Sequence, residues 1–406
     1  MSLAGFPRHR ARPRRRPSAR STHVAGRVGR GVGLVRQVAA AASIALLALL
    51  AGCSSWSDGP GYYWQSVTGH LAVMRGARPI DELLAEPGLD PLLRHKLALV
   101  LDARRFASAQ LALPANGSYT GYADLGRPFV VWNVFAAPEL SLKLKEWCFP
   151  VAGCVGYRGY YDPQDAERFA ARLRAEGYEA FVRGVPAYST LGWFDDPVLS
   201  SFVRYPDGEL ARLIFHELAH QLLYVKGDTT FNESFATAVE QAGMERWLAA
   251  REAAGADPAL RGEWQRFAAR REQFLALLER HRAALDAVYA SDALDGDKRA
   301  AKRGAFAALR SDYEALKRQW DGYAGYDRWF AQPLTNAHLA SVATYTGQVP
   351  AFRALLVQQG GDLPAFYAAA RRLGELPKAE RERALAALTP PQANPALTLL
   401  IPKPGR

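Results

Sequence analysis

The feature of this sequence that most constrains its fold is the stretch LIFHELAHQLL, residues 213–223. Its leucine, isoleucine and phenylalanine side chains favour burial, yet His216, Glu217 and His220 fall within five consecutive positions of it. Residues four apart lie on the same face of a helix, so the two imidazoles would project side by side. The pattern predicts a core helix whose polar side chains serve a purpose other than packing.

A bound metal ion is the interpretation that best explains this helix. The imidazole nitrogens of His216 and His220 can meet at one Zn²⁺ ion, and Glu217, one step around the helix, can reach a water beside it without being a ligand. A single histidine on this face would more often be a hydrogen-bonded core residue, whereas two at this spacing with a glutamate between them favour zinc. The apolar neighbours would hold the helix against the core and keep the site dry.

Catalytic zinc sites use three protein ligands, and TTFNESFATAVE at 229–240 offers two carboxylates. We expect Glu233 to be the third ligand, because an adjacent antiparallel helix would bring its first turn near the histidines. The alternative is a capping box, in which Thr230 and Glu233 only satisfy backbone N–H groups. Glu240, two turns later on nearly the same face, is a candidate to orient a histidine N–H, and Asn232 is a second supporting candidate.

These motifs resemble those of a known class of enzymes. HELAHQ followed by NESFATAVE is similar to the gluzincin branch of the zincin metallopeptidases, particularly its aminopeptidases, where N-E-x-F-A carries the third ligand. The resemblance implies a zincin-like catalytic core with His216, His220 and Glu233 as zinc ligands and Glu217 as general base. Two departures stand out: the connection between His220 and Glu233 is shorter than usual there, and the amine-anchoring G-x-M-E-N motif is replaced by VRGVPAY.

Three further stretches resemble a family of bacterial lipoproteins described as "putative aminopeptidase". They are WCFPVAGCVGYRGYYD, STLGWFDDP and LTNAHLASVATY, and together the resemblance covers most of the chain after Cys53. It implies a peptidase of the cell envelope.

The net charge of +11 does not indicate nucleic-acid binding, because the excess lies in one segment. Residues 1–52 contain ten arginines and no lysine, aspartate or glutamate, which leaves 41 basic and 40 acidic residues in the remainder. We therefore exclude nucleic acid as a partner.

The first 52 residues read as a secretory signal. An arginine-rich start precedes the apolar run VAAAASIALLALLAG at 38–52, which is short for a membrane span and suits a signal peptide. It runs into Leu-Ala-Gly-Cys53, which resembles the lipobox of bacterial lipoproteins. This resemblance implies that Cys53 is lipidated, and that the serine after it directs the protein to the outer membrane, facing the periplasm. An ordinary signal peptide followed by a chance cysteine is the alternative.

Cys148 and Cys154 are the two remaining cysteines. An oxidising periplasm makes a disulfide the default for such a pair, and the residues between them can form the turn that closes it. A metal or redox pair is the alternative, although no nearby histidine or third cysteine completes such a site.

The periodicity of the chain predicts an α+β fold that is predominantly helical. About three helices are expected within 62–113, strands at 129–138 and 140–147, a helix beginning at Asp162-Pro163, and an edge strand at 178–186 ending in Pro186. Long amphipathic helices at 233–253, 258–291 and 297–320 predict a hairpin or bundle. The predicted organisation is a signal at 1–52, a tether at 53–61, an α+β part at 62–230 with the motif helix at 207–226, a helical part at 231–390 and an irregular tail at 391–406.

Several later residues are candidates for contacts with a substrate. Tyr345, His338 and Tyr326 could stabilise an oxyanion, although ordinary packing is the alternative for each. Asn336 could touch the substrate backbone, and the edge strand around Phe181–Tyr188 could pair with an extended peptide.

Three functions are compatible with these features. The preferred one is a lipid-anchored zinc peptidase that faces the periplasm and acts on short peptides as an aminopeptidase, the activity that the resemblance implies. The second is a zinc endoprotease that cleaves envelope proteins or peptidoglycan peptides. The third is a non-enzymatic envelope scaffold that uses its helical arm.

Overall fold

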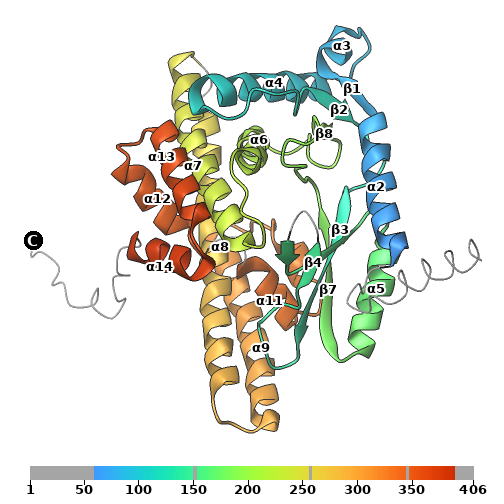
Figure 1. Cartoon of the computed structure of the whole chain (residues 1–406), viewed down its shortest axis with the longest axis vertical. Helices are drawn as coiled ribbons and strands as arrows, with labels where there is room; N and C mark the ends of the chain where they lie inside the picture. The colour runs from blue at the N-terminus through green and yellow to red at the C-terminus, as the bar shows by residue number, and fades with distance from the viewer. Residues whose placement is uncertain (1–58, 150–152, 256–257, 344–346, 389–406) are drawn as a thin grey trace, which may run out of the picture. The chain divides into compact units, whose positions relative to one another are not determined.

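The computed structural model describes residues 59–149, 153–255, 258–343 and 347–388 (Figure 1). The chain divides into two compact units, Met1–Tyr62 and Tyr63–Arg406. Only the last residues of the first unit are described, so the account below concerns the second. The signal segment, most of the tether, Cys53, Tyr345 and the tail at 391–406 lie outside the described residues.

The predicted α+β class with a predominance of helix is confirmed. Three helices precede the first long strand, as expected: α2 (Pro60–Arg75), α3 (Ile80–Ala85) and α4 (Pro91–Leu111). The motif helix is α6 (Asp207–Leu222), and the long helices are α7 (Thr229–Ala253), α8 (Ala259–Ala290) and α9 (Asp295–Gln319). The chain then forms α10 (Asp327–Phe330), α11 (Asn336–Ala343), α12 (Val349–Gln358), α13 (Leu363–Glu375) and α14 (Lys378–Leu388). None of the helices in the described ranges is long and apolar enough to cross a bilayer.

The strands form small sheets. One has the order β1 (Ala77–Pro79), β2 (Gly121–Ala123), β8 (Val198–Leu199), and another has the order β6 (Arg158–Tyr160), β3 (Val131–Pro138), β7 (Tyr178–Val185). In the described part of the chain, β7 pairs only with β3, so the prediction that this strand lies at a sheet edge is confirmed. The strand ends at Val185, one residue before the predicted end at Pro186. Helix α5 (Pro163–Ala175) begins as predicted, with the Asp162 side chain accepting a bond from Gln164 N at 2.7 Å.

The prediction of a strand at 140–147 is wrong for residues 140–146, which form neither helix nor strand. Leu142 and Leu144 contact two different apolar clusters, whereas residues two apart in a strand would share one face. The backbone, however, meets β3 at the bond from Lys145 N to Ala136 O, and this is too little pairing to make a ladder.

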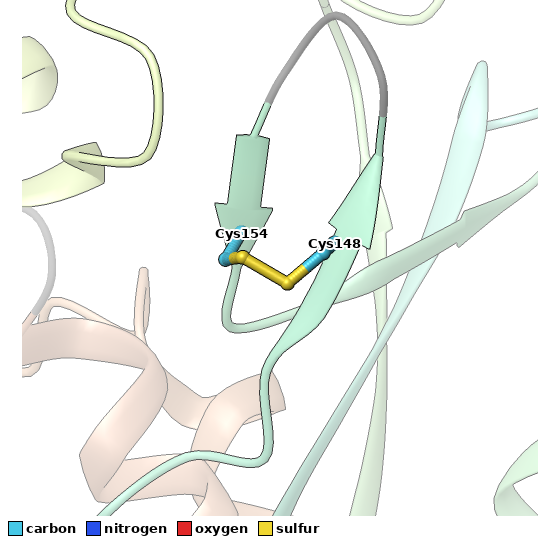
Figure 2. Close-up of a disulfide and its surroundings, with 2 residues drawn as sticks. All are labelled: Cys148 and Cys154. Atoms are coloured by element: carbon cyan, nitrogen blue, oxygen red, sulfur yellow. A yellow bond between two sulfur atoms is a disulfide. The ribbon is translucent and has the colours of Figure 1, made fainter. Parts of the chain in front are cut away.

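The disulfide predicted between Cys148 and Cys154 is present (Figure 2). It joins β4 (Trp147–Phe149) to β5 (Gly153–Val155), two antiparallel strands in which the cysteines face each other. Gly153 has a φ of +78°, and a Cβ there would lie 2.7 Å from the backbone nitrogen of Gly227. The hairpin therefore packs closely on the connection between α6 and α7, and only glycine fits at this contact.

One apolar core extends across the boundary predicted at residue 230. Helix α6 packs against α4 on one side and α7 on the other, and α12 lies against α7 (Figure 1). A second apolar cluster joins α8 and α9. The main core includes Leu97, Val100, Leu210, Ile214, Leu218, Phe231, Phe235, Phe352 and Phe366.

The connection from α6 to α7 is held by side chains on both sides of it. Helix α6 ends four residues earlier than predicted, because the Asn232 side chain accepts a bond from Val225 N at 2.7 Å and donates to Val225 O at 2.9 Å. Asp228 caps α7 by accepting a bond from Phe231 N. The other oxygen of Asp228 accepts bonds from Nε and Nη2 of Arg381 in α14 at 3.0 and 2.6 Å, and both side chains are buried.

Replacing Arg381 with methionine should destabilise the protein by about 3–5 kcal/mol, because it leaves the Asp228 carboxylate buried without its cation. The free energy of unfolding in urea measures this loss. Arg383→Met is the matched control, since Arg383 lies two residues along the same helix and is exposed. An equal loss of unfolding free energy in Arg381→Met and Arg383→Met would show that the buried pair contributes no more to stability than an exposed arginine.

Candidate metal centre

Helix α6 presents His216, Glu217 and His220 because its apolar residues set its rotation. Leu210, Ile214 and Leu218 are fully buried in the main core. The start of the helix is held by Asp207, whose carboxylate bonds Lys96 Nζ at 2.5 Å and His95 Nε2 at 2.8 Å, both from α4. The face that carries the histidines then turns toward α7.

Glu233, in the first full turn of α7, meets the two histidines. The Nε2 atoms of His216 and His220 are 3.1 Å apart. Glu233 places one carboxylate oxygen 3.3 Å from His216 Nε2 and the other 3.8 Å from His220 Nε2. Among the residues that the structure describes, these three form the group of side chains able to hold a metal ion.

The geometry of this group fits a zinc ion. Ligand atoms at about 2.0–2.1 Å around a tetrahedral ion lie roughly 3.4 Å apart. The separations of 3.1, 3.3 and 3.8 Å bracket that value. His220 Nδ1 is buried and has no hydrogen-bond partner among the described residues, so its ring is held by packing.

Glu240 supports the group from behind. One of its oxygens lies 2.9 Å from His216 Nδ1, which leaves Nε2 of the same ring directed at His220 and Glu233. The carboxylate is only 1% exposed and also binds Arg212 Nη1 at 2.6 Å and Arg271 Nη1 at 3.2 Å. Burial opposes its charge, but the two guanidinium groups outweigh this and hold the pKa of Glu240 well below its ordinary value. Glu240 thus lies where the sequence predicted a residue that orients a histidine.

The two histidines differ in their affinity for protons. Burial disfavours the charged form of His216, but its hydrogen bonds to the carboxylates of Glu233 and Glu240 prevail and raise the pKa of His216 to about 10. Burial lowers the pKa of His220 to about 4. Burial thus favours the neutral form of His220, the state in which imidazole binds metal, whereas the neighbouring carboxylates favour the protonated form of His216 in the metal-free protein.

Glu217 is buried beside this group and forms no ion pair among the described residues. Burial is the main cause that raises its pKa to about 7, and the charges of Glu233 and Asp196 add to the effect. A carboxyl group with a pKa near neutrality can both accept and return a proton at physiological pH, which suits a general base.

The capping alternative for Glu233 is not what the structure contains. The helix begins at Thr229 and its cap is Asp228, so neither Thr230 nor Glu233 serves as a capping pair. Asn232 does not contact the histidines, and it supports the site by fixing the backbone of Val225 in the connection before α7.

The later candidates have partners within the protein. The Asn336 amide donates to the carbonyls of Pro138, Glu139 and Ser141 and accepts a bond from Tyr289, so its predicted substrate contact finds no support. His338 stacks on Phe181 with ring centroids 3.7 Å apart.

Tyr326, the third candidate for the oxyanion, stacks on Phe274 at 3.9 Å. Among the candidates that the structure describes, His338 and Tyr326 therefore occupy packing positions. The remaining candidate, Tyr345, lies outside the described residues.

Sequence reasoning missed the two arginines that neutralise Glu240. Arg212 could have been found, because it lies four residues before His216 and hence on the same helix face. Arg271 comes from α8, and no local spacing relates it to the motif.

Comparison with known proteins gives one match. The family described as "Putative aminopeptidase" matches residues 61–385, which include all of the residues discussed above that form the site. No curated protein and no solved structure matched the chain.

Replacing Glu240 with glutamine should weaken Zn²⁺ binding about 10- to 100-fold, because His216 loses a charged partner. It should also destabilise the fold by about 3–5 kcal/mol, because Arg212 and Arg271 lose their counter-charge. Chelator competition and urea unfolding measure the two effects. Glu245→Gln is the control, since Glu245 lies in the same helix, is exposed and pairs with Arg261. Unchanged zinc affinity in Glu240→Gln would contradict the supporting role.

Replacing Glu217 with glutamine should stabilise the metal-free protein in a pH-dependent way. A carboxyl whose pKa rises from 4.5 to about 7 on folding favours the folded state only while protonated. Its contribution is fully present below pH 4.5 and is lost as the pH rises through 7, and glutamine abolishes this loss. The stability of the variant relative to wild type should therefore increase between pH 4.5 and pH 8, as urea unfolding of chelator-treated protein would show. A difference that is the same at both pH values would contradict the assignment.

Proposed function

Because the chain belongs to the family described as "Putative aminopeptidase", we propose that it is a zinc-dependent peptidase that acts on short peptides from their amino ends. The match covers more than three quarters of the sequence, and it supports an aminopeptidase-like peptidase directly. The metal dependence, the substrate and the location are our own inferences.

The observation that carries the proposal is the meeting of three donor groups beside a buried carboxyl group. His216, His220 and Glu233 bring their donor atoms within 4.8 Å of one another. Glu217 follows directly in the same helix turn as His216 and has its pKa near 7. A purely structural zinc site would need a fourth protein ligand, and the described residues place no further histidine or cysteine in this group.

In the proposed mechanism, His216, His220 and Glu233 would hold the zinc ion. Bound zinc would supply a Lewis acid that polarises a peptide carbonyl and makes a water molecule more acidic. Glu217 accepts the proton of the attacking water and delivers it to the leaving amine. Glu240 holds His216 through Nδ1, which leaves Nε2 free to act as the ligand atom of that ring.

The substrate backbone would bind by strand addition. Strand β7 has only one partner, β3, among the described strands, and it leads through Pro186 into the segment before β8. An extended peptide could form main-chain hydrogen bonds with this edge. The partner that we propose is a peptide, and the even balance of charge after residue 52 does not favour nucleic acid.

We also propose that the protein is a lipoprotein of the bacterial envelope, anchored in the outer membrane through Cys53 and facing the periplasm. The signal-like segment at 1–52 supports this, as does the disulfide between Cys148 and Cys154, since disulfides persist in oxidising compartments. Acyl chains on Cys53 would provide stable anchoring.

Replacing Glu217 with glutamine should keep bound zinc and reduce kcat for peptide hydrolysis about 10²- to 10⁴-fold, because the general base is lost. Metal analysis and hydrolysis of a leucine amide substrate measure the two properties. Glu209→Gln in the same helix is the control, because Glu209 is not part of the histidine group. Undiminished turnover in Glu217→Gln would remove Glu217 from its role.

The same assay separates the three functions. Hydrolysis that stops with chelator, returns with zinc and ignores N-acetylated peptides supports the proposal. Cleavage inside acetylated peptides would instead indicate an endoprotease. Absence of hydrolysis in zinc-loaded protein would indicate a scaffold.

A further inference from the structure

Asp196 is a buried carboxylate that has no cation beside it among the described residues. Four acidic side chains are classed as buried in the described residues: Asp196, Glu217, Asp228 and Glu240. Asp228 binds Arg381, and Glu240 binds Arg212 and Arg271. Asp196 is 2% exposed and forms no ion pair with any described residue, and its Oδ1 atom has no hydrogen-bond partner among them. A buried carboxylate in this state lacks the positive charge that would normally accompany it.

Asp196 follows a loop that lies on the Glu217 face of α6. Gln221 is one helical turn after Glu217 and therefore shares its face. A Cβ on Gly192 of the loop would lie 3.6 Å from the Gln221 side chain. Gln221 also donates to Ser118 Oγ at 3.1 Å, and Ser118 Oγ donates to Phe194 O at 3.4 Å. These contacts hold the loop against the proposed catalytic helix.

The backbone of Asp196 is fixed by the sheet that follows. Its carbonyl accepts a bond from Tyr119 N at 2.6 Å, just before β2 and β8 pair in parallel. Tyr119 is itself buried, and its hydroxyl has no hydrogen-bond partner among the described residues. Two buried polar atoms without a hydrogen-bond partner among the described residues, Tyr119 Oη and Asp196 Oδ1, thus lie on neighbouring segments. Such a pair indicates a site that a ligand completes.

We propose that Asp196 binds the α-ammonium group of the peptide substrate. This inference rests on the proposed function and deepens it, because it names the residue that restricts the enzyme to free amino ends. The ammonium group supplies the missing cation and donates to Oδ1, a charge-assisted bond that an acetylated amine cannot reproduce. The same loop exposes Trp193 and Phe194, which give apolar surface for the first side chain of the peptide.

The second oxygen of Asp196 has a structural role that a test must preserve. Oδ2 accepts a bond from Thr190 N at 2.8 Å and so closes the loop. Asparagine keeps one oxygen for that bond and removes the charge, so Asp196→Asn separates ammonium binding from loop structure. Asp195→Asn is the matched control, because it makes the same change at the adjacent, exposed position.

The first experiment measures binding without catalysis. Zinc-loaded mature protein carrying Glu217→Gln is titrated by calorimetry with leucinamide and with N-acetyl-leucinamide. We expect leucinamide to bind at least about 30-fold more tightly than the acetylated compound, and Asp196→Asn to abolish this preference while Asp195→Asn keeps it. Retention of the preference in Asp196→Asn overturns the proposal.

Should Asp196→Asn fail to fold, a crystal structure of leucinamide bound to zinc-loaded Glu217→Gln decides. A ligand amine within hydrogen-bond distance of Asp196 Oδ1 supports the proposal, and an amine elsewhere overturns it.

A second experiment keeps this inference distinct from the proposed function. The variants are compared with Glu217 intact on a leucine amide substrate and its acetylated form. A fall in kcat/KM of about 30-fold or more for the free amine only, in Asp196→Asn only, supports the role of Asp196. Equal hydrolysis of both substrates by wild type overturns it while leaving zinc peptidase activity established. Absence of any hydrolysis by wild type counts against the proposed function alone, and the binding experiment then decides on Asp196.

Discussion

The arrangement of the centre depends on the ion pairs that the buried carboxylate of Glu240 forms with Arg212 and Arg271 and on its hydrogen bond with His216. It joins α6 through Arg212 and His216, α7 through its own backbone, and α8 through Arg271. An acidic group so deeply buried is tolerable only because two guanidinium groups neutralise it. The orientation of His216, and hence of the side chains around it, follows from this network. Removal of any partner would leave an uncompensated charge in the core.

The connection between α6 and α7 is short and held at several points. Asn232 fixes Val225, Asp228 caps α7 and is itself bound by Arg381, and the disulfide-linked hairpin packs on Gly227. These contacts come from parts of the chain far apart in sequence. Together they place Glu233 opposite the two histidines at separations that suit a tetrahedral ion. The stability of the fold and the geometry of the centre thus have the same origin.

Glu217 and Asp196 are positions where the proposed function lowers the stability of the fold. Both are buried carboxyl groups with no basic partner among the described residues, a state that disfavours the charged form. Elsewhere in the core, buried acids are neutralised, as Glu240 and Asp228 are. Glu217 and Asp196, which lie on one side of α6, are the two exceptions. Such exceptions are expected where a substrate and a water molecule form hydrogen bonds with the carboxyl groups.

Local patterns determined much of this protein. Apolar spacing determined the long helices to within a few residues, Asp162 and Pro163 marked the start of α5, and the spacing of His216 and His220 determined that they share one face, because these properties depend only on near neighbours along the chain. The strand predicted at 140–147 failed because pairing needs a partner that the segment itself does not specify. In the same way, only the tertiary structure brought Arg271 to Glu240 and gave Asn336 its hydrogen-bond partners and His338 its stacking partner. It also buried Asp196 with no cation among the described residues. Charge neutralisation and packing are decided by residues distant in sequence, and no spacing within a helix or strand encodes them.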